Sequence, residues 1–355
     1  SSEIFINLNR FVFCETVFYL NLYLIIMKKI HVLFFNLLFF MVFSQEELKS
    51  LDATLSNYEY PFEVKYLNFK SQNQDLKMAY MDVLPKKSNG KSVLLLHGKN
   101  FNGAYWKQTA TELSKLGYRV IIPDQNGFGK SSKPSQYQYS FHQLAQNTKQ
   151  ILDELKIHKI NVLGHSMGGM LATRFAMMYP ETTEKLILEN PIGLEDYKTL
   201  TPYVSVDKMY QNESKQTAED IKNYQLKFYY DNKWKPEYDE WMYLLAGWTV
   251  NKDYPLIAWN AALTYDMIFT QPVVYEFPKL KVPTLLIIGT RDRTALGKAN
   301  ASADVQSKMG LYQNLGKETQ KKIPNSRLVE IENIGHLPHI EAFDKFIKPL
   351  VEFLK

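Results

Sequence analysis

A short apolar run precedes each of three residues in this chain. They are a serine, an aspartate and a histidine, residue types that cooperate in covalent catalysis. Ser166 is the centre of a Gly-His-Ser-Met-Gly pentapeptide at 164–168, between the apolar run 159–163 and a helix-like stretch, 170–178. A strand-to-helix turn of this kind is strained and lifts the serine hydroxyl clear of the sheet, and its glycines allow close approach of the backbone. Ser166 is therefore the candidate nucleophile, and the alternative is that it only caps the following helix.

A serine hydroxyl needs a base to take its proton, usually a histidine oriented by a carboxylate. The apolar run 282–288 leads into a loop that holds Asp292, and the run 327–331 leads into a loop that holds His336. Because the carboxyl ends of parallel strands meet at one edge of a sheet, we expect these two side chains to lie beside Ser166. The chain order serine, acid, histidine is the order expected for this triad on such a sheet.

Each partner of the serine has a rival. His339 competes with His336 as the base, but it stands where the last helix is expected to begin. Glu189 competes with Asp292 as the acid, because it also follows an apolar run. We favour His336 and Asp292, and we interpret His165, within the pentapeptide, as a packing residue.

Two backbone N–H groups are candidates for holding the oxyanion that develops on an attacked carbonyl. Met167, directly after the candidate nucleophile, offers one of them. Lys99 offers the other, since it follows His97 and Gly98 at the end of the apolar run 92–96. We expect the side chain of His97 to order this loop.

Strand-like and helix-like segments alternate along much of the chain, which is typical of an α/β fold with a mostly parallel sheet and helices on both faces. The expected strands are 63–69, 76–83, 92–96, 118–123, 159–163, 185–188, 282–288 and 327–331. The expected helices are 104–116, 140–155, 170–178 and 341–354.

Taken together, these motifs resemble the α/β-hydrolase superfamily, and the resemblance covers nearly the whole chain from Glu63 onward. The matching features are His97 and Gly98, the loop 124–132, the nucleophile elbow at Ser166, the acid loop at Asp292 and the loop at His336. The resemblance implies an α/β-hydrolase fold and a serine hydrolase that forms an acyl-enzyme without a metal or organic cofactor. A serine at the elbow argues against dehalogenase and epoxide-hydrolase relatives, which use an aspartate there. The motifs are specific for the fold and not for the substrate.

The alternation stops over 193–277, which we interpret as a helical lid inserted into a core made of 45–192 and 278–355. Three tryptophans of this lid are spaced by seven, which predicts one helical face starting near Pro236: Trp234, Trp241 and Trp248. These tryptophans are candidates for lining the substrate pocket, although packing of the lid onto the sheet explains them as well. An aromatic pocket favours carboxylic esters of small to medium apolar acids. The alternatives are cleavage of a C–C bond, an amide or a lactone on the same triad, or a non-catalytic binding protein.

The first part of the chain, 1–44, has the pattern of an upstream stretch followed by a signal peptide. Met27 and two lysines precede the apolar body 30–43, and a small residue, Ser44, precedes a polar stretch. We therefore expect cleavage near Ser44 and export to a periplasm or beyond. The alternative is an uncleaved leader that anchors the chain in a membrane.

Composition narrows the possible partners. The chain has 355 residues and a formal net charge of +5 with no long basic run, which excludes nucleic acid as an evident partner. Its one cysteine, Cys14, precedes the expected cleavage site, so a mature chain would have no disulfide and no thiolate metal site. A small-molecule substrate is the partner that we expect, and the oligomeric state is left open.

Overall fold

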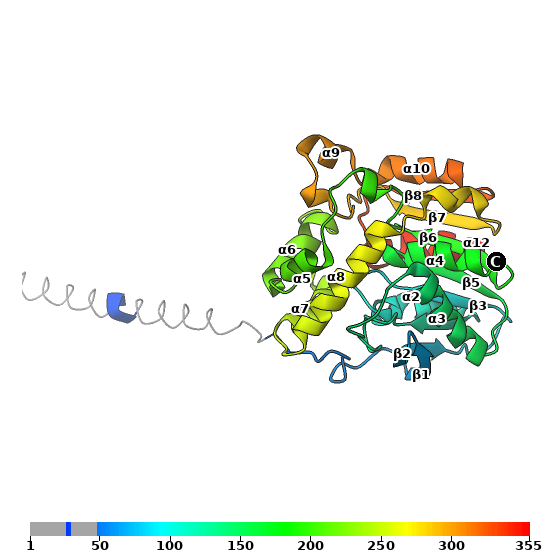
Figure 1. Cartoon of the computed structure of the whole chain (residues 1–355), viewed down its shortest axis with the longest axis horizontal. Coiled ribbons are helices and arrows are strands. Elements are labelled where there is room, and N and C mark those ends of the chain that lie inside the picture. The colour runs from blue at the N-terminus through cyan, green and yellow to red at the C-terminus, as the bar shows by residue number, and fades with distance from the viewer. Residues whose placement is uncertain (1–25, 30–47) are drawn as a thin grey trace, which may run out of the picture. The chain divides into compact units, whose positions relative to one another are not determined.

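A computed structural model describes residues 26–29 and 48–355 of the chain (Figure 1). The chain divides into two compact units, Ser1–Leu48 and Lys49–Lys355, of which the second holds the candidate site. The predicted cleavage site at Ser44 lies outside the described residues, so cleavage and export stay predictions. Across 26–29 and 48–355, every helix is too short or too polar to span a membrane.

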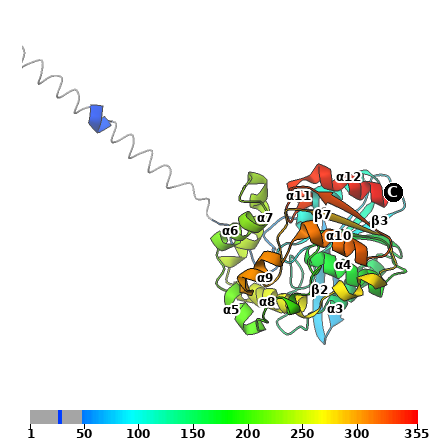
Figure 2. The ribbon, with the colours of Figure 1, turned by 90° about the horizontal axis from the view of Figure 1, so that it is seen from above.

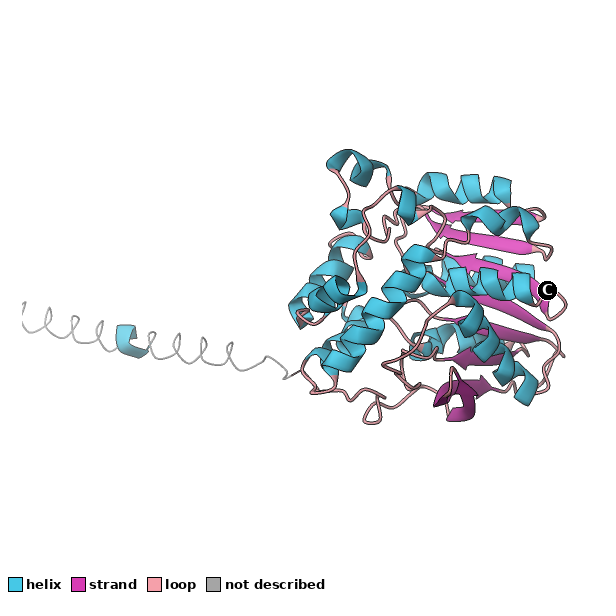
Figure 3. Cartoon of the chain, viewed as in Figure 1, coloured by secondary structure: helices cyan, strands magenta, loops and turns pink. Residues whose placement is uncertain are grey.

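Eight strands form one sheet in the order β1-β2-β4-β3-β5-β6-β7-β8, drawn in magenta in Figure 3. The strands are β1 (Val64–Ser71), β2 (Gln74–Val83), β3 (Ser92–Leu96), β4 (Arg119–Pro123), β5 (Ile160–His165), β6 (Thr183–Glu189), β7 (Thr284–Gly289) and β8 (Ser326–Ile331). β2 pairs antiparallel with β1 and with β4, and every other pairing is parallel. The predicted α/β class and mostly parallel sheet are thereby confirmed.

Helices cover both faces of the sheet, as Figure 2 shows for α12 on one side and α4 and α10 on the other. One core contains side chains of α3 (Phe141–Glu154), α4 (Met167–Met178) and α10 (Tyr312–Lys322). The opposite core contains side chains of α2 (Lys107–Lys115) and α12 (Phe343–Leu354). A parallel sheet that is covered on both faces needs apolar side chains pointing both ways, which is why its strands appear in the sequence as unbroken apolar runs.

Spacing in the sequence explains why the last helix lies on the sheet. Phe346, Leu350 and Leu354 recur every four residues and are fully buried. A repeat of that length puts the three side chains on one face of a helix, which packs on the core while the polar face meets water.

The insertion between β6 and β7 is helical, as the sequence predicts. Its elements are η2 (Tyr197–Thr199), α5 (Val206–Glu213), α6 (Ala218–Phe228), η3 (Pro236–Tyr238), α7 (Asp239–Thr249), α8 (Tyr254–Thr270) and η4 (Val274–Lys279). Figures 1 and 2 both show α5, α6 and α7 together beyond one end of the strands. The boundaries predicted for the lid, 193–277, stay a prediction.

The expected single face of three tryptophans is wrong. Trp241 and Trp248 lie in α7, whereas Trp234 precedes η3 and belongs to no helix. The reason is local, because Asp231 and Asn232 take positive φ values of 53° and 57°. Left-handed backbone of this kind ends a helix, and Pro236 then starts the next one.

The sequence prediction also missed the elements between β7 and β8, which are η5 (Lys298–Asn300), α9 (Ala303–Lys308) and α10. α10 buries only four residues: Tyr312, Leu315, Gly316 and Thr319. Two of these, Tyr312 and Leu315, are apolar. An apolar stripe this narrow gives little periodic signal in the sequence. The remaining short elements are η1 (Gly103–Trp106), before α2, and α11 (Pro338–Glu341), before α12.

Candidate active site

Ser166 occupies a strained turn between β5 and α4. Its φ of 56° and ψ of −122° lie where residues other than glycine are rare. The flanking glycines are required by space, because a Cβ on Gly164 would come within 2.0 Å of the carbonyl oxygen of Gly168. A Cβ on Gly168 would lie 2.2 Å from the carbonyl oxygen of Leu96 in β3. Any side chain at either of these two positions would therefore have to displace backbone for the turn to form.

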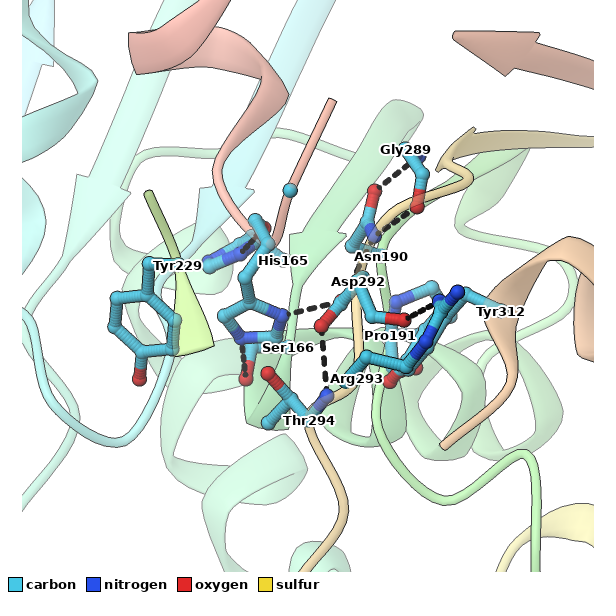
Figure 4. A network of polar contacts seen from close by, with 12 residues as sticks. His165, Ser166, Asn190, Pro191, Tyr229, Gly289, Asp292, Arg293, Thr294 and Tyr312 are labelled. Carbon is cyan, nitrogen blue, oxygen red and sulfur yellow. Dashed lines mark hydrogen bonds and ion pairs between the residues drawn. The ribbon is translucent and has the colours of Figure 1, made fainter. Parts of the chain in front are cut away.

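The structure brings Ser166, His336 and Asp292 together at the carboxyl ends of their strands. Figure 4 labels Ser166 and Asp292 in this network of polar contacts. The Ser166 hydroxyl lies 3.0 Å from His336 Nε2. The other ring nitrogen, Nδ1, lies 2.6 Å from Asp292 Oδ2. Asp292 is 0% exposed and His336 1%, while Ser166 keeps 7% of its surface open. The serine is thus the member of the group that a substrate can reach.

Two hydrogen-bond donors hold the Asp292 carboxylate in addition to the imidazole of His336. Asn190 Nδ2 donates to Oδ2 at 2.8 Å, and the backbone N–H of Thr294 donates to Oδ1 at 2.8 Å. The orientation of the Asn190 amide is itself determined, because its Oδ1 accepts from Gly289 N at 2.8 Å. Sequence reasoning missed Asn190, although its place directly after β6, at the edge that holds the triad, could have indicated it.

The rival acid and the rival base bind each other. Glu189 Oε1 accepts from the backbone N–H of His339 at 2.8 Å and lies 2.9 Å from its Nδ1. The ring of Trp106 stacks on His339 with centroids 4.4 Å apart. This second buried carboxylate–imidazole pair makes no hydrogen bond to Ser166, so the structure separates the two alternatives that the sequence left open.

His165 is not only a packing residue, because both of its ring nitrogens make hydrogen bonds. Tyr105 Oη accepts from Gly98 N at 3.0 Å, so its proton points to His165 Nδ1, also at 3.0 Å. His165 then carries its own proton on Nε2 and donates it to the carbonyl oxygen of His336 at 2.8 Å. Burial lowers the pKa of His165 well below 6.5, and the neighbouring His336 and His339 lower it further. A neutral His165 therefore links the loop at Gly98 to the loop of His336.

The two expected oxyanion donors are unused by the protein. Among the described residues, no acceptor receives the backbone N–H of Lys99 or of Met167. Met167 is the first residue of α4, where the N–H has no partner within the helix. His97 orders the preceding loop, since its Nε2 accepts from Gln125 N at 3.0 Å and its Nδ1 lies 2.9 Å from the Gly98 carbonyl oxygen. The oxyanion role of Lys99 and Met167 stays a prediction.

A cavity of about 510 Å³ lies between the inserted helices and the loops that hold the site. Trp248 lines it, whereas Trp234 and Trp241 do not. Trp234 packs instead on Tyr230 and donates its indole N–H to Asp239 at 2.8 Å. Most of the lining is apolar or aromatic and includes Phe128, Phe228, Leu245, Tyr254, Ile257 and Tyr265.

Charges at this cavity are largely compensated. Lys99 Nζ lies 3.4 Å from Glu213 Oε1 of α5, and this ion pair joins the loop after β3 to the inserted helices. Over the described parts of the chain, no cluster of three or more His, Cys, Asp or Glu side chains could hold a metal ion.

Comparison with known proteins agrees with this architecture. The model of the α/β hydrolase fold family matches residues 91–343. A crystal structure of a "probable hydrolytic enzyme" from Pseudomonas aeruginosa is 50% identical, with a TM-score of 0.86, and covers 87% of this chain and 99% of its own. An esterase from Exiguobacterium antarcticum, 22% identical with a TM-score of 0.63 over 81% of this chain and 98% of its own, shares the fold.

A third relative is the 2-hydroxy-6-oxononadienedioate/2-hydroxy-6-oxononatrienedioate hydrolase of Comamonas testosteroni, 39% identical over 108 residues. The matched stretch is 30% of this chain and spans only 38% of that relative's length. The family match extends over most of the described sheet and its loops, and the Pseudomonas structure matches nearly end to end. The chain belongs to the α/β-hydrolase fold family.

Proposed function

We propose that this hydrolase cleaves carboxylic esters through an acyl-enzyme on Ser166. The observation that carries the proposal is the imidazole of His336, which lies within hydrogen-bond distance of both Ser166 Oγ, at 3.0 Å, and Asp292 Oδ2, at 2.6 Å. This geometry suits a nucleophile, its base and the group that orients the base.

In the proposed reaction, Ser166 Oγ attacks the ester carbonyl carbon while His336 Nε2 takes the hydroxyl proton. Asp292 holds the Nδ1 proton and stabilises the imidazolium that forms. The oxyanion accepts hydrogen bonds from the free backbone N–H groups of Lys99 and Met167. When the tetrahedral intermediate collapses, His336 gives its proton to the leaving alcohol oxygen. A water molecule, activated by the same imidazole, then hydrolyses the acyl-enzyme to the acid and restores Ser166.

The size and character of the cavity support a small or medium substrate. About 510 Å³ is in the range of small-molecule sites, and an aromatic lining favours an apolar acyl or alcohol part. The second candidate is hydrolysis of a C–C bond, a lactone or an amide on the same triad. The name of the Comamonas relative favours the C–C reaction, since it denotes a hydrolase of a 2-hydroxy-6-oxo dienedioate.

Labelling with a fluorophosphonate tests the nucleophile and separates an enzyme from a binding protein. We expect the full-length protein to be labelled at Ser166 and the Ser166→Ala variant to stay unlabelled. Absence of label on the wild type would contradict the serine-hydrolase proposal. A panel of esters, lactones, amides and 2-hydroxy-6-oxo dienoates then identifies the bond, and turnover of the dienoates alone would replace the ester proposal by the C–C reaction.

A further inference from the structure

Arg291 and Glu341 together hold the loop that precedes the candidate base. The backbone N–H of Arg291 donates to the carbonyl oxygen of Ile334 at 3.0 Å, and its Nη1 donates to that of Asn333 at 2.5 Å. Glu341 Oε1 accepts from Arg291 Nη2 at 2.6 Å, and Oε2 accepts from Gly335 N at 2.7 Å. The three residues directly before the base are therefore all bound by this pair.

The pair connects the two loops that supply the acid and the base. Arg291 directly precedes Asp292 in the loop after β7, whereas Gly335 directly precedes His336 in the loop after β8. The hydrogen bond between His336 Nδ1 and Asp292 Oδ2 joins the same two loops at 2.6 Å. The contact through Glu341 is thus a second connection, one residue away from the first on each loop.

The same guanidinium reaches the inserted helices. Arg291 Nη2 also donates at 3.2 Å to the carbonyl oxygen of Tyr229, the residue that ends α6. The ring of Tyr229, which Figure 4 labels, stacks on the imidazole of His336 with centroids 4.9 Å apart. The backbones meet closely here, because a Cβ on Gly335 would lie 2.1 Å from the Tyr229 carbonyl oxygen. Arg291 therefore restrains both the backbone before His336 and the ring that packs on its imidazole.

The ion pair is largely shielded from water, with side chains 20% exposed for Arg291 and 13% for Glu341. Charge-assisted hydrogen bonds of this kind fix geometry, and removing one partner leaves the other charge partly buried and unpaired. The loop would then have to rearrange. Misplacing a catalytic group by about 1 Å can cost roughly 10²-fold in rate.

We propose that Arg291 and Glu341 are positioning residues, which hold His336 where its Nε2 meets the Ser166 hydroxyl. The inference rests on the proposed function, because it takes His336 as the base. It adds two residues that act only through the loop of His336. An ion pair with a merely structural role would stabilise the fold and leave the reactivity of each folded site unchanged.

The test compares Glu341→Ala with Asp82→Ala as a matched control. Asp82 also belongs to a shielded ion pair, since its Oδ1 lies 2.8 Å from Arg119 Nε and the two side chains are 3% and 27% exposed. Arg119 is the first residue of β4, so this pair lies at the amino end of that strand and away from the triad. Both variants should melt below the wild type, because each loses one partner of a shielded pair.

Fluorophosphonate labelling of the full-length variants gives two readouts. Its endpoint counts the folded sites with a reactive Ser166, and its rate reports how well His336 takes the hydroxyl proton. We expect Glu341→Ala to reach the wild-type endpoint with a rate reduced about 10- to 100-fold. With a 4-nitrophenyl ester, kcat should fall by a similar factor and KM should stay about the same. Asp82→Ala should keep the wild-type rate and kcat.

A double variant tests whether the two residues act as a unit. Arg291→Ala combined with Glu341→Ala should be about as slow as the slower single variant, because effects within one unit are not additive. The proposal would be overturned by a wild-type rate in Glu341→Ala, by a rate loss that a lower endpoint explains, by an equal loss in Asp82→Ala, or by effects that multiply in the double variant. If Glu341→Ala does not fold, Glu341→Gln replaces it, and its rate should still lie below that of the wild type.

Hydrogen exchange followed by NMR separates this inference from the proposed chemistry. If the wild type is not labelled, the serine-hydrolase proposal fails, while the Nδ1 proton of His336 still decides the positioning. This proton should exchange with water faster in Glu341→Ala than in the wild type and at the wild-type rate in Asp82→Ala. Equal exchange in the two variants would overturn the proposal.

Discussion

Replacing Asp292 by asparagine keeps the shape of the side chain and removes its charge. The two carboxylate oxygens differ, because Oδ2 accepts from both His336 Nδ1 and Asn190 Nδ2, whereas Oδ1 accepts, among the residues that the structure describes, only from Thr294 N. An asparagine must put its NH₂ group at one of these positions. We expect its oxygen to take the Oδ2 position, since the hydrogen bonds from His336 and Asn190 are then kept without a change of the imidazole tautomer. His336 would keep its proton on Nδ1 and stay able to act as a base toward Ser166.

The expected loss of activity follows from the negative charge that the substitution removes. With this ring tautomer kept, the variant loses the attraction between the carboxylate and the imidazolium, about 4 kcal/mol for unit charges about 4 Å apart at an effective dielectric constant of about 20. Since about 1.4 kcal/mol is a factor of ten in rate, kcat should fall by at most roughly 10³-fold. If the amide turned its NH₂ group toward His336, the proton would move to Nε2, and the loss would be about 10⁴-fold.

Steady-state hydrolysis of a 4-nitrophenyl ester by wild type, Asp292→Asn and Asp292→Ala measures this difference. The alanine variant should be the slower of the two, because it also releases the His336 ring. Nitrogen-15 NMR of the histidine side chains reports which ring nitrogen of His336 carries the proton. A proton on Nε2 in Asp292→Asn, or equal activity of the two variants, would refute the argument that Asn190 sets the orientation of residue 292.

Three further expectations concern stability. Tyr105→Phe leaves Gly98 N–H and His165 Nδ1 buried without partners, at about 1–3 kcal/mol each, so urea unfolding should show a loss of roughly 2–6 kcal/mol, and an unchanged midpoint would contradict the network. Burial keeps the pKa of His97 and His165 below 6.5, so the unfolded chain takes up protons that the folded chain refuses. The stability that these two histidines confer is present above about pH 6.5 and is lost as the pH falls below it, by up to about 1.4 kcal/mol per unit for each histidine. Denaturation curves between about pH 7.5 and 5.5 check this sign, and stability that rises on acidification would be inconsistent with it. Gly168→Ala puts a Cβ 2.2 Å from a carbonyl oxygen of β3, so thermal or urea unfolding should show a loss of about 3 kcal/mol or more, and wild-type stability would show that the elbow can relax.

Most of the sheet could be predicted because each buried parallel strand is an unbroken apolar run bounded by turn residues. The sequence prediction failed where an element lacks this contrast between apolar residues and flanking turn residues. β5 continues through Gly164 and His165, whereas the apolar run in the sequence ends at residue 163. α10 was missed because its exposed polar residues outnumber its buried residues.

The site residues divide in the same way. Ser166, Asp292 and His336 could be named from the sequence because each is of a reactive type and each follows a strand, at positions that the topology brings to one edge. Asn190 and Gln225 carry ordinary amides. The place of Asn190 directly after β6 indicates the right edge of the sheet, but the local sequence does not show that its amide holds a carboxylate, or that the amide of Gln225 has no partner among the described residues. The contacts of both amides depend on residues far away in the chain.

By itself, the sequence determined the fold class, the edge of the sheet where chemistry occurs and the candidate nucleophile, because these depend on local periodicity and on the order of strands. Only the tertiary structure decided which acid serves which base. Glu189 ends β6 and Asp292 lies in the loop after β7, at the same edge of the sheet. The side-chain geometry of His336 and His339 pairs each carboxylate with a different histidine. Hydrogen bonds act over about 3 Å and depend on direction, so residues that are equivalent in a pattern become distinct once packing sets their positions.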